Sequence, residues 1–323
     1  MENKKFNNRV FGAVIIKSIN SNFNADFTHH PRTLPDGVVY ATDKALKYAI
    51  KDYIRKNYPD EKLFVVKRYN ENLNPLSLDE TYQTVFNQEI KKVEKEELLK
   101  NLLSCIDIRL FGATFAPKGK DIEKKNISIH GPVQINHGVN KFPENEIYTE
   151  DILSPFRNPG KEDSEEKGMS TIGNQTNLKE GHYVFHFSVN PKNTEEFYEL
   201  ISDENEEKFL SQSDIDKLKE AFNKSVTYLD SSRKIGTENE ATIWVQLNEN
   251  SKKVLPSFTE LIEVRKENNK TQIDITKVNE IIDKLDSEIK SVEVYYEPSL
   301  SNIIGLEKNG KIKFFNILNN SEI

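Results

Sequence analysis

Short apolar runs separated by polar segments recur along the chain, and they predict strands. The clearest is VFGAVIIK at residues 10–17, a run rich in β-branched residues with polar segments on both sides. Similar or alternating runs predict further strands at residues 63–69, 105–111, 127–135, 183–189, 241–247 and 292–296. The run at 127–135 is interrupted by Gly131 and Pro132.

The best-defined helix is expected to begin after Thr42, a good N-cap, and to end near Asn57, ahead of Pro59. At about 100° per residue, its basic and apolar positions fall on opposite sides. The basic face consists of Lys44, Lys47, Lys51 and Arg55, and the apolar face of Ala45, Leu46, Ala49, Ile50, Tyr53 and Ile54. Further helices are expected within residues 78–103, at 213–229 and near 275–289.

Read through its insertions, the chain has the order strand, helix, strand, strand, helix, strand. That order favours an α+β fold with a ferredoxin-like sheet over a doubly wound fold. Two long segments stand apart from it. Residues 20–40 have the composition of a long loop with several turns, and residues 140–178 lack periodicity, which predicts an exposed excursion, a hairpin or a linker.

The 323-residue chain has a formal net charge of −7, which would ordinarily argue against nucleic-acid binding. The charge is unevenly distributed, however. Residues 193–220 contain ten acidic and three basic residues, whereas residues 28–69 contain nine basic and five acidic residues. The basic region is therefore local. The chain has no apolar run typical of a signal peptide or a membrane span, so we expect a cytoplasmic protein without membrane partners.

No sequence motif indicates an enzyme, because the nucleophile-elbow, phosphate-loop, dinucleotide and zinc-protease patterns are all missing. His182 and His186 are four residues apart in a strand pattern, about 13 Å by strand rise, too far to chelate one ion, so ordinary packing is expected. The single cysteine, Cys105, lies in an apolar run and is expected to be a buried structural thiol. We expect no metal ion and no cofactor.

The basic helix face could simply be solvated, but the polar residues around it favour contact with RNA. The loop before the helix offers the amides of Asn20, Asn22 and Asn24, and Arg32 lies at the junction. Ser231, Ser232, Arg233 and Lys234 follow the helix predicted at 213–229. Amide, hydroxyl and guanidinium groups of this kind suit phosphate and 2′-hydroxyl contacts.

Several fragments, in order, resemble a known family. They are NSNFNAD at 20–26, the run PR…DG…TDKALKYAIKDYI at 31–54, DIRLFG at 107–112, GPVQI at 131–135, IGNQTNLKEGHYVFHFSVNP at 172–191 and YLDSSRKIG at 228–236. Over most of its first 240 residues the chain resembles the Cas7 (Cas-seven) family, the crRNA-binding backbone subunits of type I CRISPR Cascade complexes, in the Csh-like subtype I-B branch. The first loop of that branch commonly reads NPNGD, whereas Phe23 and Ala25 stand here.

The resemblance implies a modified ferredoxin-like or RRM palm with inserted fingers and a protruding thumb. Residues 70–103 would form the helical fingers, residues 140–178 the thumb, and residues 250–323 either the rest of the palm or a subunit contact. The implied partners are guide crRNA, target DNA paired with the guide, further copies of the chain, and other Cascade subunits. The implied role is non-catalytic.

Carried onto this sequence, the resemblance assigns the guide groove to the basic helix, the loop at 20–40, and Arg109, Gln134, His137 and residues 231–234. The thumb would insert through Phe156, Arg157 and Met169. Two alternatives remain. Asp26 could activate water or a ribose 2′-hydroxyl, as in type III relatives that cut target RNA, although a turn-forming Asp is the simpler interpretation. The acidic face at 193–220 could instead serve a protein-interaction module that binds no nucleic acid.

Overall fold

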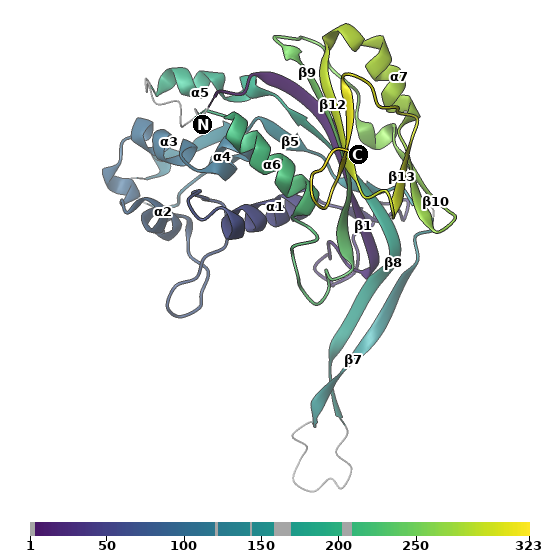
Figure 1. The fold of residues 1–323 in the computed structure, drawn as a ribbon. Helices are drawn as coiled ribbons and strands as arrows, with labels where there is room; N and C mark the ends of the chain where they lie inside the picture. Colours follow the sequence, from purple (N-terminus) through teal and green to yellow (C-terminus); the bar gives the residue numbers. More distant parts are fainter. Residues whose placement is uncertain (1–3, 120–121, 143, 158–168, 202–208) are drawn as a thin grey trace, which may run out of the picture.

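The computed structural model describes residues 4–119, 122–142, 144–157, 169–201 and 209–323, and one large, mainly antiparallel sheet forms its centre (Figure 1). Within these residues the sheet contains nine strands. Seven follow one another in the order β14 (Ile312–Asn316), β12 (Ile289–Tyr296), β9 (Thr237–Glu249), β1 (Asn8–Ser21), β8 (Met169–Val189), β6 (Gly138–Asn140) and β2 (Tyr40–Ala41). β5 (Val133–Ile135) and β7 (Ile147–Arg157) also pair with β8.

Strand β1 is apolar without interruption from Val10 to Ile16 because this part lies between two cores. Val10, Val14 and Ile16 point into the core beneath the helices on one face. Phe11 and Ile15 point into a second core on the opposite face. Alternate positions of a strand face opposite sides of the sheet, so burial on both sides needs a continuous apolar run. The strand predicted at 10–17 is therefore confirmed, and it is longer than predicted.

Two helices cover the first face, α1 (Asp43–Asn57) and α6 (Gln212–Lys224). The prediction for α1 is confirmed, and the Thr42 side chain accepts a hydrogen bond from Ala45 N. Helix α6 ends five residues before the predicted end at Leu229. The helix ends early because Asn239 Oδ1 accepts hydrogen bonds from the backbone N–H groups of Val226 and Thr227. These groups would otherwise bond to carbonyl groups of the preceding helical turn.

The second face is covered by the C-terminal part of the chain (Figure 1). It contains helix α7 (Thr276–Lys284) and a small sheet of β10 (Glu263–Glu267), β11 (Lys270–Asp274) and β13 (Ser301–Ile304). The helix predicted near 275–289 is thus confirmed in its first part. The α+β class is confirmed as well, and β1, α1, β5, β8, α6 and β9 follow the predicted order.

A third core belongs to the segment between α1 and β5. Its elements are α2 (Leu78–Phe86), α3 (Lys95–Leu103), α4 (Ile106–Phe111), β3 (Gly112–Phe115) and β4 (Ile127–His130), and α5 (Glu195–Leu200) packs beside it. Cys105 is buried here, and burial raises the pKa of its thiol to about 12. None of the described helices is both long and apolar enough to cross a membrane.

Two strand predictions are wrong. Residues 105–111 form helix α4 instead, in which Ile106 and Leu110 face the first core while Ile108 faces the third. A short helix buried on two sides shows the same apolar alternation as a strand. Residues 63–69 form no strand. The Asp107 carboxylate accepts hydrogen bonds from the N–H groups of Phe64 and Val65, so these two groups cannot pair with a neighbouring strand.

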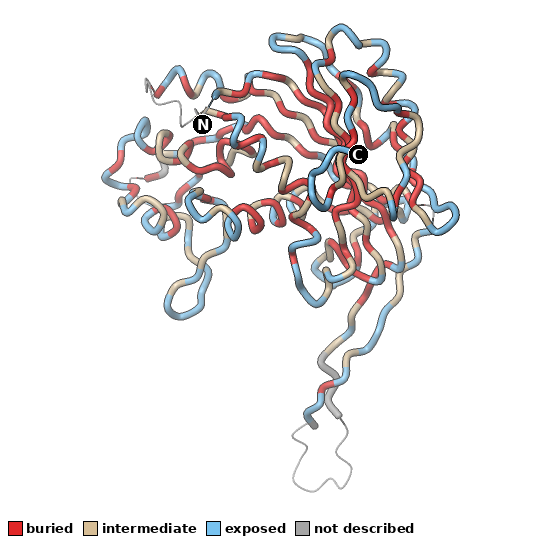
Figure 2. Tube along the Cα trace, viewed as in Figure 1, coloured by how far each residue is buried: buried red, intermediate tan, exposed pale blue. Residues whose placement is uncertain are grey.

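Strands β7 and β8 form a long hairpin that extends beyond the rest of the sheet (Figures 1 and 2). Its pairing runs from Ile147 opposite Leu178 to Arg157 opposite Met169. Of the three alternatives for residues 140–178, a hairpin is the one observed. Figure 2 shows the base of the hairpin buried and its outer part mostly exposed or half-buried, with Ser154 as a buried exception.

Candidate nucleic-acid interface

The basic face of α1 forms one wall of a cleft of about 750 Å³. Lys44, Lys47 and Lys51 line it from the helix, and Lys67 lines it from the segment after the helix. The remaining walls come from residues 64–66, α2, and the turn between α4 and β3. The stripe predicted from helical spacing is therefore part of a concave surface rather than an exposed helix face.

The lysines of the cleft differ in their partners. Lys44 is exposed and has no partner among the described residues. The Lys47 ammonium lies 3.1 Å from the Asp43 carboxylate, and Lys51 donates a 2.7 Å hydrogen bond to Val65 O. Burial lowers the pKa of Lys51 even though Asp107 lies near it. A bound phosphate would favour the charged form of Lys51 and would find Lys44 free to approach it.

Arg55 lies at the far end of the stripe, where its guanidinium contacts Asp52 Oδ1 at 2.6 Å. With Lys67 and Tyr69 it also lines a second, more open groove of about 830 Å³. The Lys67 ammonium lies 4.9 Å from the centre of the Tyr69 ring, which is half exposed. A cation next to an exposed aromatic ring suits single-stranded nucleic acid. Sequence reasoning missed Lys67 and Tyr69 because residues 63–69 were assigned to a strand, although KRY at 67–69 carries the signal.

The loop at 20–40 is fixed to the sheet by Phe23, which is fully buried. Its ring packs against Tyr183 and Phe185, with ring centres 5.8 and 6.1 Å apart. The Lys234 ammonium donates a 2.7 Å hydrogen bond to Phe23 O and lies 5.1 Å from the centre of the Phe23 ring. Phe23 therefore anchors the loop, and the positive φ angles fall at Asn20, at His29 and at Gly37 rather than at Ala25.

The three asparagines of this loop stabilise it. The Asn22 amide is buried and donates hydrogen bonds to Thr176 O and His29 O. Asn24 Oδ1 accepts two bonds from Thr42, at its N–H and its hydroxyl, both 2.9 Å long. Asn20 Oδ1 accepts a weaker bond from Tyr148. Asn22 and Asn24 thus shape the loop next to the N-terminus of α1, and they are not free donors for a ligand.

Asp26 adopts the turn-forming role. Its Oδ1 accepts hydrogen bonds from the Thr28 N–H at 2.8 Å, the Thr28 hydroxyl at 2.8 Å and the His30 N–H at 3.0 Å. The bond from the Thr28 hydroxyl is the largest of the effects that lower the pKa of this carboxyl group. Among the described residues, no three His, Cys, Asp or Glu side chains come together to hold a metal ion.

Residues 231–234 lie directly against the first loop. Asn22 N donates to Arg233 O at 2.8 Å, and Ile19 N donates to Gly236 O at 2.9 Å. Gly236 has φ +91° and its α-carbon lies so close to Ile19 that a β-carbon would be 2.5 Å from Ile19 O. Ser231 and Ser232 are exposed, Arg233 is half-buried, and Lys234 is turned inward, where burial lowers its pKa.

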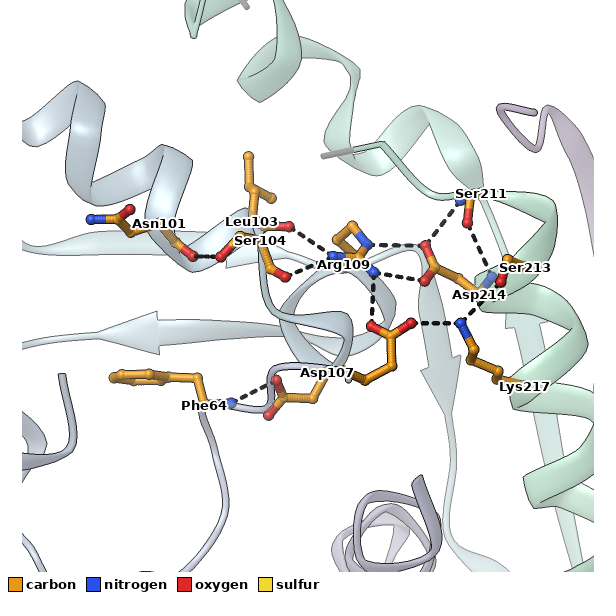
Figure 3. Close-up of polar contacts among 11 residues, drawn as sticks. Phe64, Asn101, Leu103, Ser104, Asp107, Arg109, Ser211, Ser213, Asp214 and Lys217 are labelled. Atoms are coloured by element: carbon orange, nitrogen blue, oxygen red, sulfur yellow. Dashed lines mark hydrogen bonds and ion pairs between the residues drawn. The ribbon is translucent and has the colours of Figure 1, made fainter. Parts of the chain in front are cut away.

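Arg109 does not belong to this surface, which corrects the prediction. It is buried, and its guanidinium makes two hydrogen bonds to the Asp214 carboxylate, 3.0 and 2.8 Å long, and further bonds to Leu103 O and Ser104 O (Figure 3). The Glu61 carboxylate forms an ion pair with the same guanidinium, with 3.5 Å between Glu61 Oε2 and Arg109 Nη2. A guanidinium with these partners has no donor left for phosphate.

Gln134 and His137 lie near the sheet edge. Gln134 is half-buried and its amide donates to Gly131 O at 2.8 Å. The His137 side chain is 52% exposed, packs on Tyr40 and lies 3.8 Å from Asp43, next to the cleft. Of the hairpin residues, Phe156 is 76% exposed. The side chains of Arg157 and Met169 lie outside the described residues, although their backbones pair with each other.

His182 and His186 have separate partners, in line with the packing role expected of them. His182 Nδ1 lies 2.5 Å from Glu240 Oε2 of β9, on the far side of β1, and His186 Nδ1 accepts a hydrogen bond from Phe258 N. Both are therefore structural.

The segment after α1, the loop after α6 and the hairpin all project toward the same side of the molecule in Figure 1. Among the described residues, exposed polar side chains in the cleft, beside it and in the loop after α6 include Lys44, Lys67, His137, Ser231 and Ser232. Such groups bind phosphates and ribose hydroxyls and carry little information about base identity.

The family model described as CRISPR-associated protein Cas7 matches residues 8–284. A solved chain of a "CRISPR RNA-guided surveillance complex, pre-nicking" is similar with a TM-score of 0.55 and 12% identity, over 95% of this chain and 96% of that chain. A chain of another "CRISPR RNA-guided surveillance complex" has a TM-score of 0.47 and 13% identity, over 92% and 93% of the two chains. No curated protein matches the sequence.

Proposed function

Because the chain belongs to the Cas7 family, we propose that it is a crRNA-binding backbone subunit of a type I CRISPR RNA-guided surveillance complex, or Cascade. The observation that supports this most directly is the lysine-lined cleft beside α1. Its free groups suit the sugar–phosphate backbone, so binding is independent of sequence. The bases then stay available for pairing with target DNA.

At finer detail, we propose that the subunit belongs to subtype I-B. The large sheet with α1 and α6 serves as the palm, the segment at 70–103 as the fingers, and the β7–β8 hairpin as the thumb. The C-terminal layer at 250–323, which packs on the opposite face of the sheet, completes the palm. Further copies of the chain and other Cascade subunits are the proposed protein partners.

We propose a non-catalytic role. The engagement of Asp26 Oδ1 by Thr28 and His30 supports a structural task for that carboxylate. Avidity supplies the strength of binding, because modest contacts in each copy add up along one guide.

The proposal predicts that the protein purified from cells carries RNA, visible in the ratio of absorbance at 260 and 280 nm and on a gel. Replacing Lys44 and Lys47 by Ala should weaken binding to single-stranded RNA. The magnitude of the slope of log affinity against log salt concentration should fall by about one to two, because fewer counterions are released from the RNA when fewer phosphates are contacted.

The matched control is Lys290→Ala, an exposed lysine on β12, which should leave the slope unchanged. RNA-free protein without salt-dependent RNA binding would contradict the proposed function. An unchanged slope in the double variant would move the phosphate contacts away from the cleft. Regular cuts in complementary RNA with Mg²⁺, abolished by Asp26→Ala, would contradict the non-catalytic role.

A further inference from the structure

A cavity of about 680 Å³ lies beside α1, away from the lysine-lined cleft. Its walls come from α1, the C-terminal end of α6 with the residues that follow, the start of β9, and the chain near Leu318. Tyr53, Lys56, Asn223 and Tyr228 are among the side chains that line it. None of these four residues lines the lysine-lined cleft.

Asn223 is the feature of this cavity that most needs an explanation. It is only 5% exposed, and its buried Oδ1 has no hydrogen-bond partner among the described residues. Asn239, which also lines the cavity, is by contrast fully used, since its Oδ1 accepts from Val226 N and its Nδ2 donates to Phe222 O. A buried acceptor without a partner is costly, so Asn223 Oδ1 lacks a donor that a ligand could supply.

Tyr228 gives the cavity an aromatic surface. Its ring is 45% exposed and meets the Tyr53 ring edge to face, with centres 5.3 Å apart. The Lys56 ammonium lies 5.7 Å from the centre of the Tyr228 ring. The Tyr53 hydroxyl donates to Glu220 at 2.8 Å, which fixes the inner ring. An exposed ring with a cation beside it is the arrangement on which bases of single-stranded nucleic acids stack.

The cavity is also continuous with the candidate interface. Tyr228 and Asp230 line the cavity, and the chain proceeds from them directly into residues 231–234, beside the first loop. Two lysines, Lys56 and Lys224, line the cavity against one acid, Asp230. Lys56 also pairs with Asp52 at 2.8 Å and Lys224 with Glu220 at 2.9 Å, so the exposed ring of Tyr228, rather than a net positive charge, favours a nucleobase as the occupant.

We propose that this cavity holds one unstacked nucleobase of the bound RNA, with Tyr228 stacked on the face of the base and the Asn223 amide hydrogen-bonded to its edge. The proposal rests on the proposed function and adds a base-holding site to it. Every nucleobase has a donor beside an acceptor on its pairing edge, and an amide can turn to match either order. The site therefore accepts any base and keeps binding independent of sequence.

The test compares two probes of equal length and charge, an oligouridine and an oligomer of abasic tetrahydrofuran spacers. Tyr228→Ala should weaken oligouridine binding by about 5- to 100-fold, the range for losing one stacked base, and should leave binding of the abasic oligomer unchanged. Tyr228→Phe keeps the ring and should bind as the wild type does. Ultraviolet crosslinking of 5-iodouridine RNA should attach the RNA to Tyr228, as located by mass spectrometry.

Asn223→Leu is the second variant, because leucine fills the same volume and removes the buried amide. The protein should fold at least as well as the wild type, and oligouridine binding should weaken about fivefold. A purely structural Asn223 would leave RNA binding unchanged in this variant.

The outcomes separate this inference from the proposed function. Wild-type protein that binds neither oligomer would overturn both. Strong oligouridine binding that is unaffected by Tyr228→Ala, or an equal loss for both probes, would overturn only the base-holding site. If Tyr228→Ala reduces self-association in light scattering and leaves oligouridine binding intact, the cavity receives a protein segment, and the nucleobase is excluded.

Discussion

Individual basic residues of this chain serve two purposes, RNA contact and internal ion pairing, that look alike in a sequence. Arg109 lies in the fragment DIRLFG and has the chemistry of a phosphate ligand, yet it binds the Asp214 carboxylate inside the protein. Asp214 also accepts a hydrogen bond from Ser211 N and so caps α6. A guanidinium binds carboxylate and phosphate through the same two parallel bonds. Only the fold, which brings residues 105 positions apart into contact, decides between them.

Replacing Arg109 by Met should destabilise the protein by about 3–5 kcal/mol, because it leaves the Asp214 carboxylate buried without its partner. The free energy of unfolding in urea measures this. The double variant Arg109→Met with Asp214→Asn should recover much of the loss, since Asn is uncharged and still caps the helix. If Arg109→Met instead preserved stability and lowered the salt slope of RNA binding, Arg109 would be an RNA ligand after all.

At the scale of elements, the sequence predicts helices and long strands well where one face is buried and the other is not. Helix α1 is such a case, since the spacing of its lysines already places them opposite the core. Helix α4 is not, because cores on both sides erase the difference between its faces. The shape of the loop at 20–40 could not be predicted either. It depends on Phe23 reaching Tyr183, about 160 residues further along the chain, and no local pattern encodes that contact.

His182 ties several elements together from the middle of β8. It contacts Glu240 on β9, and Glu240 Oε1 accepts a hydrogen bond from Ser301 of β13. Glu180 binds His182 on the same strand and Lys266 of β10. Burial by itself would lower the pKa of His182, but the two carboxylates outweigh burial and raise it. The charged imidazolium is therefore the form that the folded protein prefers.

This raised pKa predicts how stability depends on pH. The stabilisation from His182 is fully present below about pH 6.5, the ordinary pKa of an unfolded histidine, and is lost as the pH rises through the folded value. Urea unfolding at a series of pH values should show this decline in the wild type and not in His182→Gln. His130→Gln, an exposed histidine on β4, is the control and should behave as the wild type. A decline that persists in His182→Gln would rule His182 out as its source.

At the scale of the whole molecule, one sheet is covered by a compact layer on each face. The hairpin extends from this sheet and has little core of its own (Figure 2). Phe156 and Leu153 are exposed on it. Large apolar side chains exposed on a projecting element suggest a surface that is covered in an assembly. The sequence predicted an excursion at 140–178, but its length and direction follow from β8, whose inner half is fixed between β1 and β6.

Shortening the hairpin should therefore separate stability from assembly. A variant that removes residues 151–174 and joins Glu150 to Gln175, which pair with each other, through a short glycine turn should unfold at nearly the same temperature as the wild type. Its binding of a short RNA should persist, whereas the growth of multi-copy complexes on a long RNA, followed by light scattering, should be lost. Unchanged growth would mean that copies contact each other elsewhere.

The burial of Cys105 has a practical consequence for spectroscopy. The chain contains no second thiol, and this one is enclosed in the third core with its pKa raised to about 12. Thiolate is the form that reacts with maleimides, so the natural chain should give almost no background labelling. A cysteine introduced at the exposed Phe156 position would then be the single attachment point for a fluorophore. Energy transfer between copies labelled there could report how far apart successive hairpins lie on one RNA.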